Sequence, residues 1–165
     1  MKAHFEMFAA YNAWANRRLC DAAAGMEDAA RKAPAGAFFG SLHNTLNHLL
    51  VADRIWMNRF NGEGETHQRL DEFPFAEFGA LRTAREAMDG RIVRFVAGLS
   101  DDDLARTFTY VRVTSPEPVT QALAPALAHV FNHQTHHRGQ CHQMLTAAGR
   151  EAPPLDLLFW QREAA

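Results

Sequence analysis

Hydrophobic residues recur at intervals of three and four along four long stretches of the chain, a spacing that places them on one face of an α-helix. These stretches cover residues 2–24, about 41–60, 75–99 and about 120–148. Gly25 and Gly149 stand where the first and last helices would end, and Ser41 offers an N-cap for the second. Because strand-like patterning is confined to one short segment, we predict an all-α fold, a four-helix bundle.

The segments between the predicted helices are polar and contain residues that favour turns. Residues 61–74 have the glycines and charges of a long surface loop, a feature that often borders a functional site. Residues 100–103 are typical of a helix cap or turn, and the alternation over residues 107–114 predicts a short strand or β-hairpin before the last long helix. Residues 155–162 predict a final short helix. The pattern is compatible both with an up-down-up-down helix order and with a crossover connection.

Composition and charge are those of an ordinary globular protein. The chain has 165 residues, of which 47% are hydrophobic and 22% charged, so we expect residues 1–165 to form one domain. The net charge of −2 and the scattered short pairs of Lys and Arg argue against nucleic acid as a partner. The N-terminus lacks the apolar run of a signal peptide and no segment is long enough to span a bilayer, so we expect a cytoplasmic protein without a membrane partner.

Cysteine and histidine are the residue types that bear most directly on chemistry. Only Cys20 and Cys141 are present, and two distant cysteines cannot form a disulfide framework or a zinc ribbon. We expect both to be small buried hydrophobic residues. In contrast, five of the nine histidines lie between His129 and His142. This cluster is the most unusual feature of the sequence and points to the last long helix as the place of a functional site.

Three histidines of the cluster, at positions 129, 133 and 137, follow one another at intervals of four and therefore project from one side of a helix. At about 100° per residue, His137 falls inside the apolar arc and His133 at its border, whereas His129 and His136 lie nearer the rim. Two imidazoles four residues apart can chelate one metal ion. The same spacing also arises by chance in a histidine-rich helix, and the side chains would then be hydrogen-bonded core residues.

A histidine pair seldom makes a firm metal site, and in helical bundles further ligands come from a facing helix. His48 is the best candidate, since it lies at the edge of the apolar face that bears Trp56, while His43 points almost the opposite way. Together with His133 and His137 it predicts a site for one divalent transition metal ion, namely zinc, nickel or iron. Three nitrogen ligands would leave at least one coordination position open.

Two further polar residues lie close to this predicted site. Asp53 falls nearer the apolar arc than a free carboxylate should, so it either orients a ligand histidine, pairs with Arg17, Arg18 or Arg138, or forms an ion pair on the helix surface. Gln140 is either a hydrogen-bond donor to the ligand histidines or part of a capping or inter-helix hydrogen bond.

Four segments of the chain resemble the DinB-like family of metal-dependent enzymes, which includes thiol-dependent transferases and isomerases. Residues 11–19 resemble the family's first helix, residues 48–56 its second, and residues 155–160 its C-terminal segment. Residues 132–140, Asn-His-Gln-Thr-His-His-Arg-Gly-Gln, resemble its last long helix and are the most specific match. The resemblance covers nearly the whole chain.

The resemblance has consequences for the site, the fold and the assembly. It implies that His48, His133 and His137 hold the metal, that the bundle has a non-sequential helix order, and that two copies form a homodimer through bundle helices. The first helix also carries more aromatic surface than one bundle face readily hides, which favours a dimer. These aromatic residues are Phe5, Phe8, Tyr11 and Trp14.

Three hypotheses for the function follow. The first is a metal-dependent S-transferase that joins a low-molecular-weight thiol to an electrophilic or toxic small-molecule substrate, a reaction class supplied by the resemblance. The second is a non-catalytic, stress-related metal-binding module. The third is a plain helical dimer without a metal, and it ranks last. The sequence has no phosphate-binding loop, dinucleotide fingerprint or Ser-His-Asp spacing.

Overall fold

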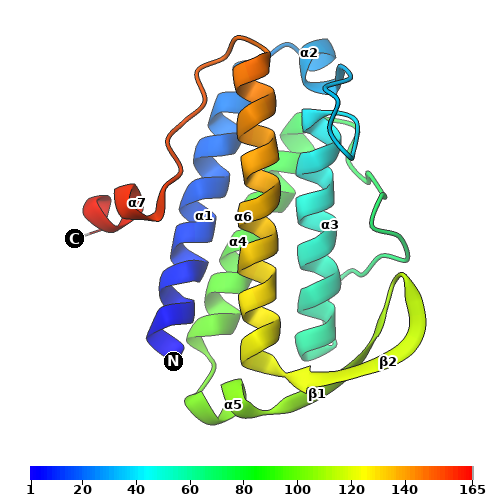
Figure 1. The fold of residues 1–165 in the computed structure, drawn as a ribbon, viewed down its shortest axis with the longest axis vertical. Coiled ribbons are helices and arrows are strands. Elements are labelled where there is room, and N and C mark those ends of the chain that lie inside the picture. The colour runs from blue at the N-terminus through cyan, green and yellow to red at the C-terminus, as the bar shows by residue number, and fades with distance from the viewer. Residues whose placement is uncertain (165) are drawn as a thin grey trace.

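The computed structural model describes residues 1–164 and consists mainly of helices (Figure 1). The four long helices are α1 (Lys2–Ala24), α3 (Leu42–Asn61), α4 (Phe78–Ala97) and α6 (Leu123–Ala147). The short helices are α2 (Asp28–Lys32), α5 (Asp101–Ala105) and α7 (Leu157–Glu163). The antiparallel strands β1 (Thr107–Arg112) and β2 (Ser115–Ala122) form a hairpin. The predicted all-α fold with a four-helix bundle and a short hairpin is confirmed.

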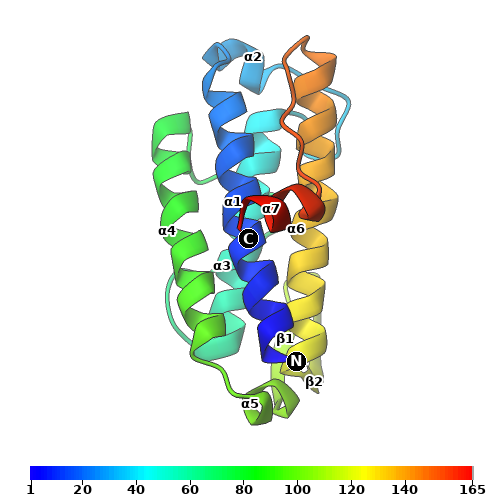
Figure 2. The same cartoon turned by 90° about the vertical axis from the view of Figure 1, so that its left-hand side faces the viewer.

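The four long helices pack in a non-sequential order, as predicted. Helix α1 contacts α4 and α6, and α3 contacts the same two helices, so α3 lies diagonally opposite α1 (Figures 1 and 2). Helices α1 and α6 run in one direction, and α3 and α4 run in the other. Because α3 and α4 are parallel, residues 62–77 must return along the length of the bundle before α4 begins. The long loop is therefore a crossover connection.

The structure moves two of the predicted helix boundaries. The last long helix begins at Leu123 and not near Thr120, because residues 115–122 pair with β1 and Thr120 lies opposite Thr109. Helix α4 begins at Phe78 and not at Phe75, since the Phe75 backbone N–H donates instead to the Asn47 side chain at 3.0 Å. Both shifts arise from tertiary pairing, which competes with local helix propensity.

Two short helices differ from the sequence-based expectation. Helix α2 was not predicted at all. Helix α5 forms where the sequence predicts only a cap or turn: Ser100 and Asp103 make a reciprocal capping box, and a single helical turn follows it. None of the helices formed by residues 1–164 combines the length and hydrophobicity needed to cross a membrane.

Both cysteines belong to the hydrophobic core, as predicted. Burial raises the pKa of the Cys20 thiol to about 12 and also raises the pKa of the Cys141 thiol. Both thiols therefore stay protonated near neutral pH, and the thiolate is the reactive form of cysteine. Neither cysteine can serve as a nucleophile in this fold.

Three of the four aromatic residues of α1 are buried by the chain itself, and the fourth, Phe8, is half-buried and packed against the core. Tyr11 and Trp14 are buried, the Tyr11 hydroxyl donates to the Leu155 carbonyl at 2.6 Å, and the Trp14 indole N–H donates to Glu163 at 2.7 Å. Helix α7 and the segment before it thus pack against α1 (Figure 2). The argument for a dimer from surplus aromatic surface is therefore wrong, and the homodimer stays a prediction that rests on the resemblance alone.

Candidate metal centre

Three histidine side chains from two helices meet between α3 and α6. His48 comes from α3, and His133 and His137 come from successive turns of α6. The Nε2 atoms of His48 and His133 are 3.3 Å apart, and one ring nitrogen of each histidine lies within 4.8 Å of those of the other two. His48 and His137 are buried and His133 is half-buried. The structure thus brings together all three residues that the sequence predicts as metal ligands.

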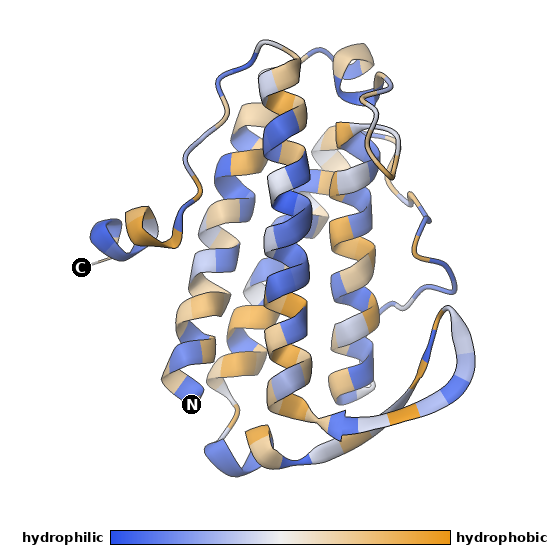
Figure 3. Ribbon diagram, in the orientation of Figure 1, coloured by the Kyte–Doolittle hydropathy of each residue, from blue (hydrophilic) through white to orange (hydrophobic). Residues whose placement is uncertain are grey.

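The sequence of α6 explains why polar side chains reach this position. The middle of the helix is hydrophilic, whereas hydrophobic residues dominate its first turns (Figure 3). The buried residues Val130, Gln134 and Cys141 hold one face of α6 against the bundle. His133 and His137 lie beside that face, on the side toward α3. When the core residues of α6 pack against the bundle, both imidazoles therefore face His48.

Hydrogen bonds fix the orientation of two of the three imidazole rings. His48 Nδ1 donates to the Leu70 carbonyl at 2.8 Å, and His137 Nδ1 donates to the Gln140 side-chain oxygen at 2.8 Å. Each neutral ring therefore keeps its Nε2 lone pair free, which is how proteins orient histidine ligands of a metal. Gln140 does contact the site, but as an acceptor and not as the donor considered from the sequence. Phe39 stacks on the His48 ring with centroids 3.8 Å apart.

Burial keeps the three imidazoles uncharged. It lowers the pKa of His48 to about 4 and, together with the neighbouring histidines, lowers the pKa of His133 to about 3. Burial also lowers the pKa of His137. Neutral imidazole is the form that binds a transition metal, and a cluster of converging lone pairs is unfavourable until a cation or proton lies among them. The donor set therefore fits one divalent transition metal ion.

We expect acid to destabilise the metal-free protein through these histidines. The pKa values of His48 and His133 lie below the unfolded value of 6.5, so the unfolded chain binds more protons. The free energy of unfolding is therefore unaffected by their titration above pH 6.5, and it decreases as the pH falls toward about 4, the pKa of His48, and about 3, the pKa of His133. Urea unfolding of metal-free protein at several pH values measures this slope. In His133→Ala the slope over that range should be shallower; an unchanged slope would contradict the assignment.

The remaining histidines named from the sequence lie outside the triad. His43 is buried, and its Nε2 contacts the Phe75 carbonyl at 2.7 Å, so it has the structural role of a hydrogen-bonded core histidine. His136 is exposed and contacts Gln140. His129 lies next to the Trp56 ring, with centroids 5.2 Å apart, one turn of α6 before His133.

Asp53 belongs to a buried polar network and does not contact the histidines. Its carboxylate pairs with Arg85 at 2.7 Å, and Arg85 also pairs with Asp89 at 2.9 Å. The interpretations of Asp53 as a histidine-orienting residue, as a surface ion pair, or as a partner of Arg17 or Arg18 are therefore wrong. Arg138 belongs to the same network and interacts with Asp53 electrostatically, but the ion pair is formed with Arg85. In the sequence, the only indication of this network is that Arg85 occupies a position in the apolar repeat of α4. The buried polar residues of the network are Asn12, Asn16, Asp53, Arg85, Asp89, Gln134 and Arg138.

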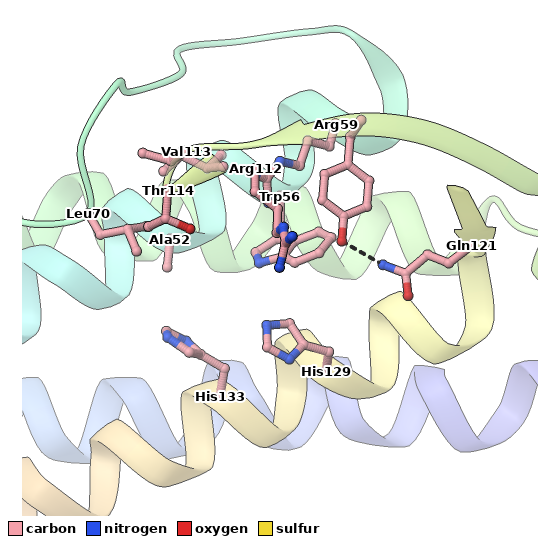
Figure 4. Close-up of a pocket in the computed structure, with 12 residues that line it drawn as sticks. Ala52, Trp56, Arg59, Leu70, Arg112, Val113, Thr114, Gln121, His129 and His133 are labelled. Carbon is pink, nitrogen blue, oxygen red and sulfur yellow. Dashed lines mark hydrogen bonds between the residues drawn. The ribbon is translucent and has the colours of Figure 1, made fainter. Parts of the chain in front are cut away.

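A cavity of about 430 Å³ opens beside His133 (Figure 4). Its walls come from α3, the β1–β2 hairpin, the crossover loop and α6, so it exists only because the hairpin folds back toward α3. The sequence predicts the hairpin but not this role. The lining residues are Ala52, Ile55, Trp56, Arg59, Leu70, Tyr110, Arg112, Val113, Thr114, Gln121, His129 and His133.

Comparison with known proteins places this geometry in a family. A model of the DinB family matches residues 1–164. The chain belongs to the DinB family. Protein DinB of Bacillus subtilis (strain 168) is 24% identical to this DinB-family chain over 153 residues, which cover 88% of this chain and 87% of that protein.

Two solved structures share the fold of this DinB-family protein. A DinB-like protein from Bacillus cereus ATCC 10987 superposes with a TM-score of 0.69 at 17% identity, covering 88% of this chain and 91% of that one. YfiT from Bacillus subtilis, described as a probable metal-dependent hydrolase with an unusual four-helix bundle topology, also has a TM-score of 0.69, at 15% identity, covering 92% and 91%. At these identities the likeness shows the fold, including its unusual helix order.

Proposed function

We propose that this DinB-family protein is a metal-dependent enzyme that transfers a small thiol to an electrophilic compound. One observation carries the proposal: three neutral imidazoles converge, and one of them, that of His133, lines a cavity large enough for a small molecule. His48, His133 and His137 would hold one divalent transition ion and leave a coordination position for a ligand. When bound, that ion favours the thiolate form of a coordinated thiol near neutral pH.

The other residues of the cavity suit a reaction in which the thiol is the nucleophile. Both cysteines are buried with raised pKa values, and none of the residues lining the cavity is Asp or Glu. In the transfer, the sulfur electron pair forms the new S–C bond, the leaving group departs with its bonding pair, and the thiol proton passes to solvent. Trp56 and Tyr110 offer apolar surface to the electrophile.

The test uses tag-free protein loaded with zinc, nickel, iron or cobalt. Each preparation is mixed with 1-chloro-2,4-dinitrobenzene and, in turn, with glutathione, bacillithiol, mycothiol and cysteine. We expect at least one thiol to give metal-dependent conjugate and to change the visible spectrum of the cobalt protein, and we expect His133→Ala to abolish both effects. His142→Ala, also on α6 but outside the triad, is the matched control.

Two other functions give different results in the same experiment. The description of YfiT favours a hydrolase, which would cleave an activated ester such as p-nitrophenyl acetate in a metal-dependent reaction that needs no thiol. A non-catalytic metal-binding module would conjugate none of the thiols, and its cobalt spectrum would not respond to them. Either result would contradict the proposed transferase.

A further inference from the structure

The cavity beside His133 is positively charged. Arg59 of α3 and Arg112 of β1 line it, and no Asp or Glu is among its lining residues. Arg112 is weakly paired, since its nearest carboxylate, that of Glu117, lies 3.9 Å away and both side chains are exposed. A cavity with cationic walls and apolar surface favours small molecules that carry negative charge.

The guanidinium of Arg59 is held in a fixed position. It lies 4.7 Å from the centroid of the Trp56 ring and 4.5 Å from that of Tyr110, one aromatic from α3 and one from the hairpin. One of its N–H groups donates to the Val111 carbonyl at 3.1 Å. The Tyr110 hydroxyl in turn accepts from Gln121 at 2.9 Å, which fixes the ring (Figure 4).

Arg59 also lacks the carboxylate partner that a half-buried arginine usually has. Within residues 1–164 it forms no ion pair, whereas Arg54, on the preceding turn of α3, pairs with Glu65. A guanidinium has five N–H donors, and Arg59 uses one of them within the described chain. Its other nitrogens are accessible to a ligand. A buried nitrogen without a hydrogen-bond partner would indicate the opposite, and Arg59 has no such atom. Burial disfavours the charged guanidinium and so lowers the pKa of Arg59. A bound anion would stabilise that charge.

We propose that Arg59, assisted by Arg112, is a subsite for the carboxylate of a small thiol whose sulfur lies at the histidine triad. Arg59 and one histidine of the triad line the same cavity: His133 belongs to its α6 wall, and Arg59 to its α3 wall. A planar guanidinium binds a carboxylate through two parallel hydrogen bonds, which fixes orientation as well as affinity. The substrate class is thus a carboxylate-bearing thiol. This inference rests on the proposed function.

The test compares two thiols of similar length on the cobalt-loaded protein. These are 3-mercaptopropionate, which carries a carboxylate, and 3-mercapto-1-propanol, which is neutral. We expect the carboxylate thiol to bind about tenfold more tightly, measured from the cobalt spectrum at constant ionic strength. Arg59→Gln should remove this preference without weakening the neutral thiol, and Arg59→Lys should keep part of it. Arg94→Gln, an exposed charge change on α4, should leave the preference intact.

The outcomes separate this inference from the proposed function. If both thiols change the spectrum with equal affinity, or if Arg59→Gln keeps the preference, the carboxylate subsite is wrong while thiol binding at the triad stands. If neither thiol changes the spectrum, the proposed function fails, and calorimetry with 3-phenylpropionate and its neutral amide then tests the subsite alone. Equal affinities for these two ligands, or a preference that Arg59→Gln does not reduce, would overturn it. Circular dichroism and metal content confirm that each variant is folded and loaded.

Discussion

Replacing His133 and His137 by Ala together should reduce the metal content of the protein from about one ion per chain to almost none. The two residues supply two of the three nitrogen atoms that converge within 4.8 Å, and His48 alone cannot chelate an ion. Either single replacement should weaken binding more than about 100-fold, since even outer contacts of a metal site are worth 10- to 100-fold. Elemental analysis of tag-free protein and competition with a chelator measure these effects.

Two further variants make this experiment specific. His142→Ala removes another histidine from α6 without touching the triad, and it should keep full metal content. Gln140→Ala removes the acceptor of His137 Nδ1 and should weaken binding by about ten- to hundredfold, between the control and the ligand variants. If the double variant at 133 and 137 retains the ion with unchanged affinity, the metal lies elsewhere and the assigned ligands are wrong.

The grouping of the three histidines could be predicted because it follows from helical periodicity. Histidines four residues apart share one side of a helix, and His48 lies at the border of an apolar face, so helical spacing brings them toward the same interior. The helix order could not be predicted from this pattern. A hydrophobic face indicates that a helix is buried, but it does not identify the neighbour. The family resemblance supplied that information.

The contacts around the triad left little or no signal in the sequence. The ring of His48 is oriented by the backbone carbonyl of Leu70, and a carbonyl is common to every residue type. The cavity forms where the hairpin returns over α3, a long-range arrangement that local alternation cannot specify. Arg85 was visible only as a charged residue in an apolar repeat, and its partners Asp53 and Asp89 became clear once the helices were placed.

The network around Arg85 connects the helices of the bundle to the histidine triad. Asp53 and Asp89 approach one guanidinium from two helices, α3 and α4. Burial acts to lower the pKa of Arg85, but the two carboxylates outweigh it, so that pKa lies above its usual value. Gln134, next to His133 in sequence, donates to the Leu49 carbonyl at 3.1 Å, and Leu49 follows His48. The network thus fixes α3 and α6 relative to each other at the level of the histidine triad.

Replacing Arg85 by Met should therefore lower the free energy of unfolding by about 3–5 kcal/mol, because two buried carboxylates would lose their shared counter-charge. Arg82→Met is the matched control on the same helix: its partners Asp21 and Glu86 are exposed, so its loss should cost at most about 1 kcal/mol. Urea unfolding of metal-free protein measures both. We expect zinc to bind the folded state at the histidine triad, so adding it should recover part of the loss in Arg85→Met. Equal, small losses in the two variants would show that the buried network contributes no more than a surface ion pair.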